Sequence, residues 1–261
     1  MRILFVADVF GSPGRAAVRS LLPRLKSERG VDATVANAEN AAGGYGLTPE
    51  NAEELWASGC DVLTGGNHLW AQRAIADFIP RHPRLLRALN FPPGTPGAGS
   101  AIWRTETGEL MGVAYVLGRT FMAPLDDPFR ALDAELSRPE WREVRVRLIE
   151  VHAEATSEKL AVAHHLDGRV SAVVGTHTHV QTADARVLPG GTAFITDAGM
   201  TGPHDSIIGV EKELALQRFR TGLPVRFQPA RGDVWLNGAM IEVDEDSGRA
   251  LTIQPVREPV R

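Results

Sequence analysis

Strand-like and helix-like segments alternate through the first 70 residues, and this alternation limits the possible folds more than any other feature. Apolar runs of strand length cover residues 2–8, 31–40 and 60–70. Between them, 14–30 carries apolar residues at helical spacing, 48–59 begins with Thr-Pro, and both end in glycine. These signals predict helices. Strands that alternate with helices are typical of βαβ units in an α/β protein.

The rest of the chain is richer in strands. Strands are predicted over 109–118, 144–154, 170–175 and 192–199, helices over 127–138 and 156–168, and a C-terminal hairpin that turns at residues 244–248. One mixed sheet or two packed sheets, with helices outside, would satisfy this pattern. The sequence has no repeat, low-complexity tract or linker. We therefore expect one domain over residues 1–261.

The charge balance and the single cysteine restrict the function and the compartment. The net charge is −4, which provides no basic field for coating nucleic acid. No stretch approaches the roughly 20 apolar residues of a membrane span, and the N-terminal apolar run is too short for a signal peptide. Cys60 is the only cysteine, so an internal disulfide is excluded. We expect a cytoplasmic protein that does not enter the membrane.

Five predicted strands end in side chains that can bind a metal or transfer a proton. These are Asp8, Glu39 with Asn40, Asn67 with His68, His152, and His177 with His179. Ligands of α/β folds bind beyond the carboxyl ends of strands, so these side chains are expected to meet. Residues two apart on an extended strand face one side, which predicts that both His177 and His179 face the site.

The chemistry of this set favours divalent cations. Neutral imidazoles suit Zn, Mn or Fe, and carboxylate and amide oxygens complete such sites. A bridging carboxylate holds two cations about 3.5–4 Å apart, and such a pair polarises a phosphoryl group and generates hydroxide near neutral pH. Glu39 is the best candidate for the bridge.

Each residue also has a simple structural explanation. Asp8 and Asn67 can serve as turn residues, Glu39 and Asn40 as loop caps, a lone histidine as a packed core residue, and the Thr-His-Thr-His segment as an exposed turn. Independent capping does not predict that all five sets occur at strand ends. The remaining histidines adjoin prolines or lie on a predicted helix and are assigned to the surface or to packing; they are His82, His164, His165 and His204.

The motifs resemble those of the calcineurin-like metallophosphoesterases. The segments that carry the resemblance are FVADVFG, ANAEN, GGNHLW, EVHAE and GTHTHV, in that order. Two positions depart from the superfamily pattern: Phe10 stands where a histidine is usual, and Glu39-Asn40 replaces part of a Gly-Asp motif. With ADVFGSPGR and TDAGMTGP, these departures resemble a bacterial subfamily of phosphodiesterases that act on cyclic nucleotides, including 2′,3′-cyclic ones.

The resemblance implies a fold, a ligand set and a cofactor. The fold would be α/β, with two packed mixed β-sheets flanked by helices. One metal would be held by Asp8, Glu39 and His179, and the other by Glu39, Asn67, His152 and His177. Asn40 would add a metal contact. The cofactor would be two divalent transition-metal ions, with Fe or Mn favoured by the mixed nitrogen and oxygen ligands and Zn as the alternative.

The resulting hypothesis is a binuclear phosphodiesterase that hydrolyses 2′,3′-cyclic or 3′,5′-cyclic nucleotides by attack of a metal-bridging hydroxide. His68 would be the catalytic general acid that protonates the leaving group. The glycine-rich loop 196–206 either shapes the substrate pocket or is an ordinary turn.

Three other functions remain open at this stage. They are a phosphomonoesterase or nucleotidase on the same metals, a non-catalytic regulator that senses a nucleotide or RNA, and a purely structural metal site. The expected partner is a small cyclic nucleotide, with RNA ends as a second candidate. A homo-oligomer is also expected, with the apolar, proline-rich segment 91–101 as the guess for its contact.

Overall fold

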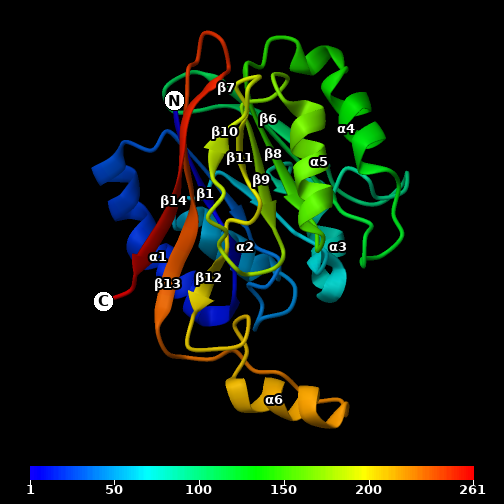
Figure 1. Cartoon of the computed structure of the whole chain (residues 1–261), viewed down its shortest axis with the longest axis vertical. Coiled ribbons are helices and arrows are strands. Elements are labelled where there is room, and N and C mark those ends of the chain that lie inside the picture. Colours follow the sequence, from blue (N-terminus) through cyan, green and yellow to red (C-terminus); the bar gives the residue numbers. More distant parts are fainter.

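Two mixed β-sheets pack face to face in the computed structural model, which describes residues 1–261, and helices cover their outer sides (Figure 1). The apolar layer between the sheets includes Phe5 from the first sheet and Tyr115 and Val174 from the second. The prediction of two packed mixed sheets flanked by helices is therefore confirmed.

The first sheet contains the parallel strands that the early alternation predicts. Its order is β2 (Asp8–Val9), β12 (Met200–Pro203), β13 (Val234–Val243), β1 (Arg2–Val6), β3 (Ala33–Asn37), β4 (Val62–Thr64) and β5 (Leu85–Leu86), and β14 (Ala250–Pro259) pairs with β13. β1, β3, β4 and β5 run parallel to one another, whereas β13 is antiparallel to β1 with Arg2 opposite Glu242. The carboxyl ends of the parallel strands share one edge.

The second sheet has the same design. Its order is β10 (Arg186–Val187), β11 (Ala193–Ile195), β9 (Ala172–Thr176), β8 (Val146–His152), β7 (Leu110–Leu117) and β6 (Ser100–Arg104). Strands β7, β8, β9 and β11 are parallel, while β6 and β10 are antiparallel additions at the two sides. The parallel pairs again bring several carboxyl ends to one edge.

Each sheet is covered by helices that bury an apolar face against it. The first packs against α1 (Gly11–Arg29), α2 (Pro49–Ala57) and α3 (Ala74–Phe78), and the second against α4 (Pro128–Leu136) and α5 (Thr156–Leu166). Short 3₁₀ turns complete the connections at Leu69–Ala71, Ile79–Arg81 and Pro139–Trp141. None of the helices combines the length and the apolar content needed to span a membrane.

Several short elements were not predicted, among them α3, β5, β6 and β10, and two longer differences concern residues 196–206 and 212–221. Residues 196–206, predicted as a glycine-rich loop, contain β12, which pairs with both β2 and β13. Helix α6 (Lys212–Thr221) was not predicted and projects from the body of the molecule (Figure 1). Of its residues only Ala215 is buried, so α6 has no apolar face packed against the body of the molecule.

Candidate metal centre

The predicted site residues gather at the carboxyl edge of the two sheets. Asp8 follows β1, Glu39 and Asn40 follow β3, Asn67 and His68 follow β4, His152 ends β8, and His177 and His179 follow β9. The first sheet therefore supplies the carboxylates, the amides and His68, and the second supplies three histidines. The centre spans the seam between the sheets.

Asp8, Glu39 and His179 form the first group of possible metal ligands. All three are buried, and their ligand atoms lie within 4.8 Å of one another. His179 Nε2 is 3.5 Å from Asp8 Oδ2 and 3.9 Å from Glu39 Oε1. Asp8 Oδ1 is buried and has no hydrogen-bond partner. An orphaned buried carboxylate oxygen is costly unless a ligand satisfies it, so this group fits a cation.

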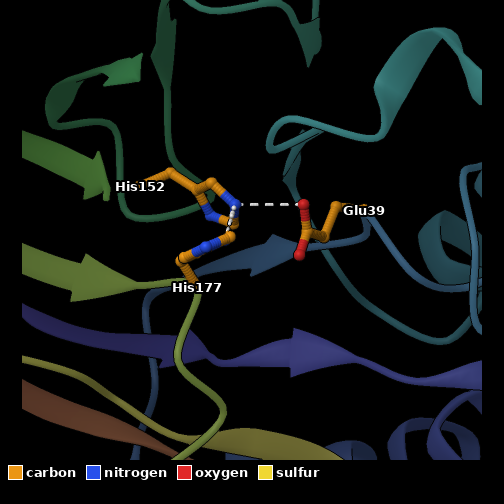
Figure 2. A group of neighbouring side chains, drawn as sticks. All are labelled: Glu39, His152 and His177. Carbon is orange, nitrogen blue, oxygen red and sulfur yellow. Dashed lines mark hydrogen bonds and ion pairs between the residues drawn. The ribbon is translucent and has the colours of Figure 1, made fainter. Parts of the chain in front are cut away.

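Glu39, His152 and His177 form the second group, and their side chains point toward one another (Figure 2). His152 Nε2 lies 3.0 Å from Glu39 Oε2, 3.1 Å from His177 Nδ1 and 2.7 Å from the side-chain oxygen of Asn67. Glu39 belongs to both groups, with Oε1 toward the first and Oε2 toward the second. A carboxylate in this position has the arrangement of a bridging ligand.

In the metal-free centre, the buried carboxylates and histidines shift one another's pKa values. Burial raises the pKa of Asp8 to about 7. Burial opposes ionisation of Glu39 as well, but the charge of His152 and hydrogen bonds from His152 and His179 hold its pKa well below its ordinary value. Burial also opposes the charged form of His152, yet Glu39 and Glu150 raise its pKa to about 10. Metal binding needs neutral imidazole, so a cation would replace these protons.

His177 and His179 do not continue β9 as an extended strand. Their φ angles are 100° and 64°, in a region that non-glycine residues seldom adopt. Both rings face the site, as expected, but the extended-strand geometry from which this was predicted is absent. Instead the turn sends the His177 ring to the second group and the His179 ring to the first. Such strain persists only where surrounding contacts hold it.

Asp197 and Lys159 hold this turn, and the sequence analysis missed both. Asp197 Oδ2 accepts hydrogen bonds from the Thr178 backbone N–H (3.0 Å) and hydroxyl (2.8 Å). Lys159 Nζ donates to the same oxygen at 2.7 Å, and both side chains are buried. On the other side, Asp8 Oδ2 accepts from the His177 N–H at 3.1 Å. A lysine on a helix usually faces solvent, so Lys159 gives no sequence signal of such a role.

Replacing Lys159 by methionine is expected to lower the free energy of unfolding by about 3–5 kcal/mol, because it leaves a buried carboxylate without its cation. Urea denaturation measures the loss. Lys212→Met is the matched control, since Lys212 pairs with Asp205 at 2.6 Å on the surface and exposed pairs contribute little. Equal stability of the two variants would contradict a supporting role for the Lys159–Asp197 pair.

A buried polar network lies behind His152. Its Nδ1 is 2.9 Å from the Thr176 hydroxyl, which donates to Glu150 Oε1 at 2.7 Å. Asn37 Nδ2 donates to the same Glu150 oxygen at 2.6 Å, and Asn37 Oδ1 accepts from the Glu39 backbone N–H at 3.0 Å. Metal-binding histidines are commonly fixed in this way through the ring nitrogen that does not face the metal. Glu150, Asn37 and Thr176 were not predicted.

The approach of Gly66 to Glu39 explains one glycine of the GGNHLW motif. A Cβ atom at Gly66 would overlap Glu39 Oε2, so no larger side chain fits at this position. The next residue, Asn67, donates its backbone N–H to that oxygen at 3.1 Å. The backbone after β4 therefore packs directly against the Glu39 carboxylate and fixes its position.

Asn40 connects the centre to His68. Its Nδ2 donates to Glu39 Oε1 at 2.8 Å and lies 3.2 Å from His179 Nε2, so its Oδ1 faces His68 Nδ1 at 3.1 Å. An amide binds metals through oxygen, and Asn40 would have to turn its amide over to become a ligand. Burial lowers the pKa of His68, which is half-buried.

Phe10, the departure from the superfamily pattern, forms an apolar wall. It is 4% exposed and packs with Met200 and Val210. Its ring lies edge-on to His179 with the centroids 5.7 Å apart. A phenyl ring donates no lone pair to a cation. A metal in the first group would therefore be bound by Asp8, Glu39 and His179, with nearby amides or water as further ligands.

The two groups open into a cavity of about 640 Å³, a size typical of small-molecule sites. Glu39, His68, His177 and His179 line it together with Tyr45 and other apolar residues. The remaining histidines lie elsewhere: His82 stacks on Phe78, His165 pairs with Asp133, His204 bonds the Met200 carbonyl, and His164 is exposed on α5.

Comparisons with known proteins agree over nearly the whole chain. Residues 4–256 match the profile of a family described as YmdB-like protein. The 2′,3′-cyclic-nucleotide 2′-phosphodiesterase of Bacillus subtilis strain 168 is 49% identical over 256 residues, covering 98% of this chain and 96% of the relative. A putative phosphatase/phosphodiesterase of Mycoplasma pneumoniae is 33% identical, covering 98% and 92%.

Two crystal structures share the architecture. A hypothetical protein from Thermus thermophilus has a TM-score of 0.93 with 45% identity, and the match covers 100% of both chains. A structure described as a novel phosphatase from Mycoplasma pneumoniae has a TM-score of 0.92 with 32% identity, covering 99% of this chain and 93% of the other. The matched region includes every residue of the two ligand groups.

Proposed function

The chain belongs to the YmdB-like family of the metallophosphoesterase superfamily, and from this membership we propose that it is a metal-dependent phosphodiesterase acting on 2′,3′-cyclic nucleotides. The 3′,5′-cyclic nucleotides are a second diester class within the proposal. The observation that carries it is the position of Glu39 in two carboxylate–histidine groups. Glu39, His177 and His179 of these groups line a cavity large enough for a nucleotide.

Each cation would be held by one of the two groups, with Glu39 shared. Asp8 and His179 complete the first set, and His152, His177 and Asn67 complete the second. Asn40 would join the first set only if its amide turned, and its Oδ1 would then no longer face His68. Fe or Mn suits this mixture of nitrogen and oxygen ligands best, with Zn as the alternative. Two such cations would neutralise charge on the phosphoryl oxygens and activate water near neutral pH.

His68 has the position of a proton donor to the leaving group. It lines the cavity, and Asn40 Oδ1, which only accepts, fixes a proton on Nδ1. Nε2 is then the ring nitrogen free to serve the substrate, and it carries a proton in the imidazolium form. Burial lowers the pKa of His68, which makes its imidazolium form a stronger proton donor.

The proposal is tested by comparing a diester with the matching monoester on metal-loaded protein. We expect two transition-metal ions per chain by elemental analysis and hydrolysis of 2′,3′-cyclic AMP, with far slower release of phosphate from 3′-AMP. RNA that ends in a 2′,3′-cyclic phosphate belongs in the same assay as the second proposed partner. Faster hydrolysis of 3′-AMP would favour a monoesterase, and metal binding without turnover would favour a regulator.

We further propose a homo-oligomer in a reducing compartment such as the cytoplasm. Cys60 is buried, and burial raises the pKa of its thiol to about 12, so it is unsuited to disulfide exchange. None of the exposed large apolar side chains lies in the segment 91–101, whereas α6 exposes both Leu216 and Phe219. Light scattering of the purified protein would measure its mass, and a monomer would contradict this proposal.

A further inference from the structure

Tyr45 is an exposed aromatic side chain at the rim of the metal cavity. The residue is 58% exposed, although it lines the cavity together with Glu39 and His179. The Tyr45 ring is tilted against the His68 ring with the centroids 4.5 Å apart. An aromatic face is thus presented next to the residue proposed to serve the leaving group.

The loop that carries Tyr45 has a defined conformation. Glycines 43, 44 and 46 all have positive φ, which residues with a Cβ seldom adopt. The Gly44 N–H donates to the Asn40 carbonyl at 3.0 Å, and the Ala42 N–H donates to the Gly46 carbonyl at 2.8 Å. Gln72 also donates from its side chain to the Tyr45 carbonyl at 3.0 Å. The exposed ring therefore stands on a backbone fixed at both ends.

Other apolar side chains line the same cavity from a distant part of the chain. Ile208 and Phe227 are both more than one-third exposed and line it with Tyr45. The His179 ring is hydrogen-bonded through Nδ1 to the Ile208 carbonyl at 2.9 Å. The cavity thus combines a polar floor of possible metal ligands with an apolar rim. Such a division suits a ligand with an anionic group at one end and a flat apolar group at the other.

We propose that Tyr45 is the stacking platform for the nucleobase and so a specificity-determining residue of the site. This inference rests on the proposed function, because the phosphodiester must lie over the ligand groups for the base to reach the rim. Stacking tolerates any base, since every base has a π-face. Tyr45 therefore selects nucleotides over phosphodiesters that lack a base, rather than one base over another.

The inference is tested with metal-loaded protein and two substrates. These are 2′,3′-cyclic AMP and the 2′,3′-cyclic phosphate of methyl riboside, which has no base. Loss of one stacked base corresponds to about 5- to 150-fold. We expect Tyr45→Ala to lower the ratio of the two kcat/KM values by that factor, with a much smaller change on the base-free substrate. Tyr45→Phe keeps the ring and is expected to retain most of the ratio.

Controls separate stacking from other roles. Phe121→Ala removes another exposed aromatic ring, 91% exposed and outside the cavity lining, and is expected to leave the ratio unchanged. If Tyr45→Ala lowers both kcat/KM values equally, Tyr45 acts by positioning His68 and the stacking inference is overturned.

A binding measurement distinguishes this failure from failure of the proposed function. Calorimetric titration of metal-loaded protein with 3′-AMP and with inorganic phosphate needs no turnover. We expect Tyr45→Ala to weaken 3′-AMP binding and to spare phosphate binding. Equal affinities for 3′-AMP in wild type and Tyr45→Ala would overturn the inference, whereas wild-type protein that hydrolyses neither cyclic substrate would overturn the proposed function.

Discussion

Glu39→Gln is expected to lower hydrolysis of 2′,3′-cyclic AMP by more than the roughly 100-fold that the loss of an outer hydrogen-bond partner causes at metal sites. The carboxylate belongs to both ligand groups, so one substitution removes a negatively charged ligand from each. Glutamine has nearly the same shape and fits beside Gly66, which keeps the packing comparable. Elemental analysis is expected to show that the variant retains less metal than the wild type after dialysis.

Glu150→Gln is the matched control for this prediction. Glu150 is buried and does not belong to either ligand group. It accepts a hydrogen bond from the Thr176 hydroxyl, which in turn is hydrogen-bonded to His152 Nδ1. We expect about a 10- to 100-fold loss of activity or metal affinity, as for other partners of ligating histidines. A Glu39→Gln enzyme that keeps two metal ions and wild-type turnover would rule out a bridging role for this carboxylate.

His68→Ala is expected to keep its metal and to lose about 10²–10⁴-fold in kcat, the usual contribution of a positioned general acid. The imidazole lines the cavity and contacts Asn40 rather than belonging to either ligand group. Elemental analysis and steady-state kinetics on the same preparation measure both properties.

His164→Ala provides the comparison for His68. His164 is exposed on α5, away from the cavity, and its removal is expected to change neither metal content nor turnover. Wild-type kcat in His68→Ala would remove this residue from the mechanism. Loss of metal together with activity would instead make it a support of the ligand groups.

The positions of several strands, and of the polar residues that follow them, could be predicted from the sequence. A parallel strand buried on both faces appears as an unbroken apolar run, and its first polar residues lie where the run stops. β1, β4 and β9 show this pattern, whereas β3 and β8 are mostly buried but carry Thr34, Arg147 and Glu150 within the run. The structure brings the side chains that follow these strands, including Asp8 and Glu39, to one edge.

The supporting network could not be read in the same way. Asn37 and Glu150 lie on strands, and both are buried. Strand periodicity assigns a residue to a face of its own sheet, but not to a partner on a second sheet. The 2.6 Å hydrogen bond from Asn37 to Glu150 depends on how the two sheets are stacked. The positive φ angles of His177 and His179 likewise follow from contacts with Asp8 and Asp197.

Strand β12 escaped prediction because its residues, Met200–Pro203, include glycine and proline. Such residues usually mark a loop, but at this position the strand is short and its pairing is supplied by distant neighbours. Gly202 lies opposite Trp235 on β13, and Met200 lies opposite Asp8 on β2. Tertiary contacts therefore override the local preference.

The pairing of β1 with β13 sets the order in which the centre matures during synthesis. Arg2 lies opposite Glu242. Strand β1 is synthesised first, but it can pair with β13 only after nearly the whole chain has been made. Until then β1 has an unpaired edge, and non-local pairings of this kind form late. Strand β12, which lies between β13 and the strand that contains Asp8, arrives at the same late stage. The nascent chain thus carries every possible ligand by residue 179 but completes their scaffold only after its carboxyl-terminal strands have been made.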